Sequence, residues 1–65
     1  MKYFRIYGKE KAEKNFKAYD YENGIFVNNL IYATMIKEPE LEKAEKAIKF
    51  LNDNNDEYIF QLRGV

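Results

Sequence analysis

The hydrophobic pattern at the start of the chain alternates with the period of a β-strand. Residues 2–7 are rich in aromatic and β-branched side chains, and every second one would point to the same side of a sheet. One side of this strand would carry Phe4 and Ile6, and the other side Tyr3, Arg5 and Tyr7. Gly8 is expected to end the strand. The lysine-rich residues 9–15 have no apolar period and are expected to form an exposed loop.

A hairpin signal follows this loop. Strand-like alternation resumes over residues 16–22 and returns over residues 25–27, on either side of Asn23-Gly24. An Asn-Gly pair accepts the two positive φ angles of a type I′ turn, so the pattern predicts a two-residue hairpin. The register that follows pairs Glu22 with Ile25, Tyr21 with Phe26, Asp20 with Val27 and Tyr19 with Asn28.

The C-terminal half predicts one helix and one further strand. Residues 30–34 would either continue the hairpin strand or begin a short helical turn, and we favour the strand. Pro39 suits the first turn of a helix, where its missing N–H has no partner to lose. The apolar residues that follow at helical spacing are Leu41, Ala44, Ala47, Ile48 and Leu51. Residues 52–56, rich in Asn and Asp, would end this helix, and residues 57–63 alternate as a last strand.

Together these elements predict a single α+β domain over residues 1–65. We expect a small, four-stranded, mostly antiparallel sheet in the order β-β-β-α-β, packed against one helix. The chain has no cysteine, so its stability must come from packing, and it fits a reducing compartment. It has neither the apolar core of a signal peptide nor the run of about 20 apolar residues that spans a membrane. A soluble, cytoplasmic protein is therefore expected.

The composition argues against catalysis. The chain contains no His, Cys, Ser or Trp, which removes the usual nucleophiles, the neutral-pH general base and the soft metal ligands. The acidic residues of the predicted helix alternate with Lys, which is typical of a solvated surface. The three glycines lie far apart, and residues 53–57 lack the ligand spacing of a calcium loop. We expect no enzyme activity, cofactor, metal or small-molecule substrate.

The charges are unevenly distributed although the net charge is zero. Residues 1–37 carry a net charge of +3 and residues 38–65 a net charge of −3. A nucleic-acid-binding domain usually has a clear basic excess. The small, local excess found here weakens the interpretation as a nucleic-acid-binding protein.

The aromatic residues are the remaining feature with functional content. A helix of about 14 residues is about 21 Å long and about 10 Å wide, whereas a four-stranded sheet is about 19 Å across and about 18 Å along its strands. One helix would therefore leave about a third of one sheet face, and all of the other face, uncovered. The hairpin has one side with Phe16, Ala18, Ile25, Val27 and Ile31, and another with Tyr19, Tyr21, Phe26, Leu30 and Tyr32. We expect the tyrosine-rich side to be exposed, because a phenol keeps its hydroxyl in water while its ring packs.

An exposed aromatic sheet face has three physical uses: binding another protein, forming a homodimer, or stacking unpaired bases. Tyr and Arg are enriched at protein hot spots, and Arg5 lies between Tyr3 and Tyr7 on one side of the first strand. We therefore expect non-catalytic binding of another protein, with single-stranded nucleic-acid binding or self-association as alternatives and no membrane partner. The candidate binding residues are Tyr3, Arg5, Tyr7, Tyr19, Tyr21, Phe26 and Tyr32.

Three parts of the chain carry a family resemblance. They are the run NGIFVNNLIYATMI, the Glu/Lys-rich helix and the run EYIFQLRGV, within residues 16–65. In these parts the chain resembles short uncharacterised proteins encoded by bacterial phages and mobile elements. The resemblance implies a small accessory protein that acts by binding a host or phage macromolecule, and it supplies no catalytic residues.

Overall fold

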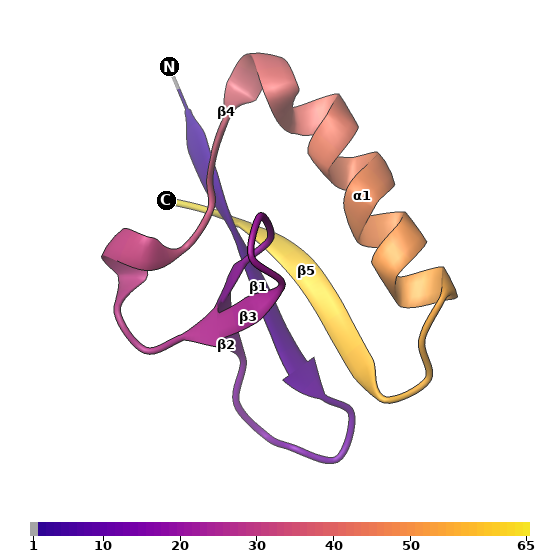
Figure 1. The fold of residues 1–65 in the computed structure, drawn as a ribbon. Coiled ribbons are helices and arrows are strands. Elements are labelled where there is room, and N and C mark those ends of the chain that lie inside the picture. The colour runs from indigo at the N-terminus through magenta and orange to yellow at the C-terminus, as the bar shows by residue number, and fades with distance from the viewer. Residues whose placement is uncertain (1) are drawn as a thin grey trace.

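The computed structural model describes residues 2–65 as a curled antiparallel sheet with one helix packed on it (Figure 1). Its elements are β1 (Tyr3–Glu10), β2 (Lys17–Asp20), β3 (Ile25–Val27), the 3₁₀ turn η1 (Leu30–Tyr32), β4 (Met35–Lys37), the 3₁₀ turn η2 (Glu38–Glu40), α1 (Leu41–Asp53) and β5 (Tyr58–Gly64). The expected α+β fold with a single long helix is confirmed, with a fifth strand added to the sheet. Within residues 2–65 no helix is both long enough and apolar enough to cross a bilayer.

Strand β1 is the centre of the sheet. One of its edges pairs with β5 along nearly its whole length, from Phe4 opposite Gly64 to Glu10 opposite Tyr58. Its other edge is shared, since the first half pairs with β4 and the second half with β2, which in turn pairs with β3. The first and last strands of the chain therefore lie side by side (Figure 1).

Gly8 does not end the first strand, contrary to the prediction. Strand β1 continues through Gly8 to Glu10, and Gly8 lies opposite Phe60 in β5. A Cβ atom at Gly8 would lie 2.6 Å from a ring carbon of Phe60 and 3.1 Å from a ring carbon of Phe26. The missing side chain leaves the space in which rings from strands on both sides of β1 meet. Packing, rather than a turn, requires glycine here.

The hairpin is present, but its turn is longer than predicted. The observed pairs are Ala18–Val27, Tyr19–Phe26 and Asp20–Ile25, so the predicted register is wrong by two positions. Gly24 has a φ of 66°, whereas no non-glycine residue among residues 2–65 has a positive φ, which excludes a type I′ turn at Asn23-Gly24. The carboxylate of Asp20 accepts hydrogen bonds from the backbone N–H of Asn23 at 3.3 Å and from its side-chain amide at 2.6 Å. Because the shift is an even number, each strand residue keeps its predicted side.

Residues 30–34 contain a helical turn rather than the strand that we favoured. The side chain of Asn29 accepts a hydrogen bond from the N–H of Ile31 at 3.1 Å and so caps η1. A strand begins only at Met35, where β4 pairs with residues 3–5 of β1. That pairing joins segments far apart in the sequence, so local propensity does not reveal it.

The predicted helix and the strand after it are confirmed. Pro39 lies in η2, directly before α1, and α1 ends at Asp53, within the predicted stop. The side chain of Asn52 connects the end of the helix to β5, because it accepts from the N–H of Phe60 at 2.8 Å and donates to its carbonyl at 3.0 Å. These two bonds fix how far the last turn of α1 lies from β5.

The core lies between α1 and one face of the sheet. Its buried members are Ile6, Ile36, Ala44 and Phe60, and the half-buried side chains around them are Phe4, Tyr19, Phe26, Ile48, Leu51, Tyr58 and Leu62. Helix α1 packs mainly on β5 and β4, and four aromatic rings that contact one another fill the rest of this face, with the Tyr19 and Phe60 centroids 4.9 Å apart. The expected exposure of the tyrosine-rich side of the hairpin is therefore wrong for Tyr19 and Phe26. Their rings pack against each other and against those of Tyr58 and Phe60.

Candidate functional site

The face of the sheet turned away from α1 is the candidate interaction surface, and we call it the open face. Because Phe4 and Ile6 point into the core, the alternate residues of β1 point to the other side. The register of β4 and β5 then determines which of their side chains share that side. On these three strands the open face consists of Tyr3, Arg5, Tyr7, Lys9, Met35, Lys37, Ile59, Gln61 and Arg63.

An arginine held between two aromatic rings lies on the open face. The guanidinium carbon of Arg63 is 4.8 Å from the ring centroid of Tyr7 and 4.9 Å from that of Phe16. With its amide oxygen turned toward the guanidinium, Gln61 accepts hydrogen bonds from Nη2 of Arg63 at 2.7 Å and from Nε at 2.6 Å. The Lys9 ammonium lies 5.4 Å from the Phe16 centroid. These contacts hold Arg63 in one position and bring Phe16 to this face.

The open face is positively charged. Arg5 lies directly opposite Arg63 on neighbouring strands, an arrangement in which like charges repel and destabilise a sheet. Lys9 and Lys37 add two further cations, and the open face of β1, β4 and β5 has no Asp or Glu side chain among the described residues. The Nε of Arg5 is also buried without a hydrogen-bond partner in residues 2–65. A bound anionic group would relieve the repulsion between the two guanidinium groups.

The acidic residues are concentrated elsewhere. The body of α1 carries three acidic and three basic residues: Glu42, Glu45 and Asp53 against Lys43, Lys46 and Lys49. Further acidic residues flank the helix at Glu38, Glu40, Asp56 and Glu57. The ion pair between Lys46 and Glu42 has a distance of 3.9 Å and involves side chains that are 79% and 85% exposed, so it contributes little stability. The open-face cations of β1, β4 and β5 therefore share their side of these strands with no described Asp or Glu, and Asp20 of β2 is the acidic residue on this side of the sheet.

The structure divides the seven candidate residues among four places. Tyr3, Arg5 and Tyr7 come together on the open face; Tyr19 and Phe26 lie on the side of α1; Tyr21 is in the hairpin turn and Tyr32 is in η1. Tyr21 and Tyr32 are exposed, at 43% and 64%, and η1 lies on the side of the molecule opposite α1 (Figure 1). The seven residues therefore do not form one continuous aromatic surface.

Three side chains of the candidate site were missed by sequence reasoning: Phe16, Gln61 and Arg63. The alternation of the last strand placed Gln61 and Arg63 on one side, so their common orientation was visible in the sequence. Their position beside Tyr7 depends on the pairing of β1 with β5, which joins opposite ends of the chain. Phe16 reaches the same face from the loop between β1 and β2.

Two hairpin side chains have shifted pKa values with structural causes. Burial, aided by electrostatic repulsion from Tyr21 and Asp20 when the phenol ionises, raises the pKa of Tyr19 above its ordinary value. Hydrogen bonds from Asn23 lower the pKa of the Asp20 carboxyl. Neither group lies beside a nucleophile, and residues 2–65 contain no cluster of three or more acidic side chains suited to a metal ion.

No protein-family model, curated protein or solved structure matches this chain. Its class is therefore defined by its own geometry. That geometry is a small α+β domain with a core on one side of the sheet and a basic, partly aromatic surface on the other.

Proposed function

We propose that this domain is a non-catalytic interaction module whose open face binds an acidic segment of another protein. The observation that carries this proposal is the pair of Arg5 and Arg63, two cations side by side on a face of β1, β4 and β5 without a described Asp or Glu. A guanidinium forms two parallel hydrogen bonds with a carboxylate, so an acidic segment would offset the repulsion between the pair. Tyr3, 40% exposed on the same side of β1, adds a ring and a hydroxyl of the kind enriched in protein interfaces.

Single-stranded nucleic acid is the less favoured partner for the open face. Base stacking needs aromatic rings whose faces are free. The rings of Tyr7 and Phe16 already hold Arg63 between them, which leaves Tyr3 as the free ring on the described open face. One free ring supports an interface with a protein better than a stacking platform for several bases.

We also propose that the module acts in the cytoplasm as a small accessory protein. The absence of cysteine suits a reducing compartment. The resemblance to phage- and mobile-element-encoded proteins supports a role in which a host or phage macromolecule is bound rather than chemically changed.

Oligoglutamate and oligothymidylate of similar charge provide the test. Each is labelled with a dye and titrated with the protein at increasing salt, and binding is followed by fluorescence anisotropy. We expect tighter binding of oligoglutamate, and a loss of about tenfold or more in Arg5→Glu, because one cation of the pair becomes an anion. Lys49→Glu makes the same change of net charge on the exposed surface of α1 and should bind as the wild type does.

Four results would contradict the proposal. Failure of oligoglutamate to bind, or equal losses in Arg5→Glu and Lys49→Glu, would show that the open face is not a specific site. Tighter, steeply salt-dependent binding of oligothymidylate would assign the face to nucleic acid instead. A tight dimer in sedimentation equilibrium, dissociated by Arg5→Glu but not by Lys49→Glu, would show that a second copy occupies this face.

A further inference from the structure

The outer edge of β5 has backbone groups that the sheet leaves unpaired. The N–H of Val65 donates to the carbonyl of Tyr3 at 2.9 Å, and the N–H of Lys11 donates to the carbonyl of Glu57 at 2.9 Å. In an antiparallel pair the hydrogen-bonded positions alternate. The odd-numbered residues of β5 therefore bond to β1, and the N–H and C=O groups of its even-numbered residues point away from the sheet.

Helix-end asparagines cover only the first half of this outer edge. Asn52 pairs with both backbone groups of Phe60, and the side chain of Asn55 accepts a hydrogen bond from the N–H of Tyr58 at 2.6 Å. Further along, the outward backbone groups of Leu62 and Gly64 have no partner within residues 2–65. An uncovered strand edge of this kind is a template for pairing with another strand.

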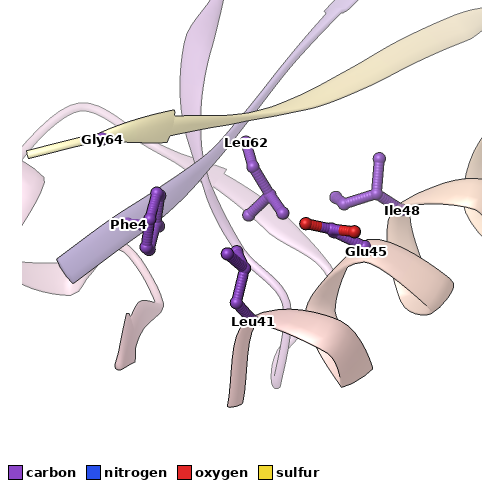
Figure 2. Close-up of a pocket in the computed structure, with 6 residues that line it drawn as sticks. All are labelled: Phe4, Leu41, Glu45, Ile48, Leu62 and Gly64. Atoms are coloured by element: carbon purple, nitrogen blue, oxygen red, sulfur yellow. The ribbon is translucent and has the colours of Figure 1, made fainter. Parts of the chain in front are cut away.

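A groove of about 370 Å³ lies next to these uncovered positions. It separates the first turns of α1 from β5 and is lined by Phe4, Leu41, Glu45, Ile48, Leu62 and Gly64. Figure 2 shows the side chains of Phe4, Leu41 and Leu62 pointing toward one another, with the carboxylate of Glu45 reaching toward Leu62 beside Ile48. Glu45 is the single charged group among these lining residues, which are otherwise apolar.

We infer that this groove is a second binding site, distinct from the open face, which accepts an extended peptide strand. The peptide backbone pairs with Leu62 and Gly64 and thereby extends the sheet beyond β5. One apolar side chain of the peptide occupies the groove between Leu41 and Leu62. A Lys or Arg of the peptide lies beside Glu45, whose carboxylate has no ion-pair partner among residues 2–65.

A second copy of this chain fits the groove less well than a foreign peptide does. Two copies paired antiparallel through β5 would be centred near Leu62 or Arg63, because Asn52 already occupies the backbone of Phe60. Such a pair would also bring Arg63 of each copy close to the other, which adds like-charge repulsion at the junction. A basic-apolar peptide meets neither obstacle.

Gly64→Pro tests the inference with little change to the domain itself. Proline removes only the outward N–H of Gly64, and proline is tolerated on strand edges whose N–H faces solvent. A Cβ at this position would meet its nearest atom, in the Phe4 ring, at 3.9 Å, so the ring has space. Gly64→Ala adds the same Cβ but keeps the N–H, and it is the matched control.

A random-peptide display library is selected on the immobilised wild-type protein, and the recovered peptides are synthesised and titrated. We expect peptides with alternating apolar residues and at least one Lys or Arg. Their affinity should fall by about tenfold in Gly64→Pro, because a backbone hydrogen bond is lost, and should be unchanged in Gly64→Ala. Peptide binding should also shift the amide resonances of Leu62 and Gly64 in the wild type, a readout that is independent of how the variants fold.

A charge pair of variants adds a second control. Glu45→Gln should weaken the same peptides, whereas Glu42→Gln, on the same helix but outside the groove, should not. The inference would be overturned if every recovered peptide bound Gly64→Pro as tightly as it binds the wild-type protein. A wild-type dimer that Gly64→Pro dissociates would also overturn it. Peptides that no longer bind Arg5→Glu but still bind Gly64→Pro occupy the open face. The two proposals can therefore succeed or fail separately.

Discussion

Replacing Gly8 with alanine should destabilise the domain by about 1–2 kcal/mol. The new Cβ would lie 2.6 Å and 2.7 Å from two ring carbons of Phe60, well inside ordinary contact. The ring has little room to retreat, because Phe60 is 7% exposed and its centroid is 4.9 Å from that of Tyr19. The Phe26 ring is stacked with the Phe60 ring, with their centroids 6.2 Å apart, and so also limits the movement of Phe60.

The magnitude combines two opposing effects. Adding a methyl group to a filled core typically costs about 1–3 kcal/mol in displaced side chains and backbone. Alanine also restricts the unfolded chain relative to glycine, which stabilises the folded state by about 0.4–1 kcal/mol. The overlap at Gly8 is severe enough for the first effect to exceed the second. Because a domain of this size is stable by only about 3–10 kcal/mol, the difference is readily measured.

Urea unfolding followed by far-ultraviolet circular dichroism is the assay. A loss of about 1–2 kcal/mol should lower the urea midpoint by about 1–2 M, because small domains have slopes near 1 kcal/mol per molar. Gly64→Ala is the control, since its Cβ would have only one neighbour within 4 Å, at 3.9 Å. It should leave stability unchanged or raise it slightly. A Gly8→Ala protein as stable as the wild type would refute the idea that aromatic packing requires this glycine.

Two further changes test the ends of the helix and of the hairpin. Asn52→Ala should lower stability by about 1–3 kcal/mol and speed hydrogen exchange at the amide of Phe60, because the backbone of Phe60 loses both of its hydrogen bonds to the Asn52 side chain. Unchanged exchange would contradict this role. Asp20→Asn should change the pH dependence of the melting temperature. The folded-state pKa of Asp20 is lowered by Asn23, so its stabilisation is present above the unfolded pKa of about 3.9 and is lost as the pH falls through the folded value. The variant should therefore be less stable than the wild type at neutral pH and approach it in acid, and parallel curves would exclude the effect.

Elements governed by local sequence were predicted well, and those governed by distant contacts were not. The helix from Leu41 to Asp53 follows from its apolar spacing and from Pro39 before it, so the sequence alone revealed it. Strand β4 has only three residues and exists because β1 offers it an edge. Gly8 was assigned to a strand end for the same reason, since the ring that requires it comes from β5.

The hairpin shows how a strong local signal can be overridden by a neighbouring side chain. Asn-Gly favours a two-residue turn, but the carboxylate of Asp20 bonds both the backbone and the side chain of Asn23. Asn23 then has a negative φ and only Gly24 is left-handed, which lengthens the loop. The predicted side of each strand residue is still correct, because the observed register differs from the predicted one by two positions.

Only part of the candidate site was predictable, for the same physical reason. Alternation placed Tyr3, Arg5 and Tyr7 on one face, and the structure agrees. Whether Tyr19 joins them depends on which face the helix covers, and that depends on the whole sheet. The position of Arg63 opposite Arg5 could not be predicted, because it follows from the pairing of the first and last strands and the two residues are 58 positions apart in the chain.

The two proposed surfaces meet at β5, and this position constrains what a partner would look like. Arg63 points to the open face, while the outward backbone groups of Leu62 and Gly64 lie on either side of it at the edge. A strand added at that edge would point alternate side chains to the two faces of the sheet. Those on the side of α1 would meet the apolar groove and Glu45, and those on the other side would lie next to Arg63. A single segment that binds both surfaces should therefore alternate, with apolar or basic residues toward the groove and acidic residues toward the open face. Selection of that pattern, rather than of uniformly acidic or uniformly apolar peptides, would show that the edge and the open face recognise one partner.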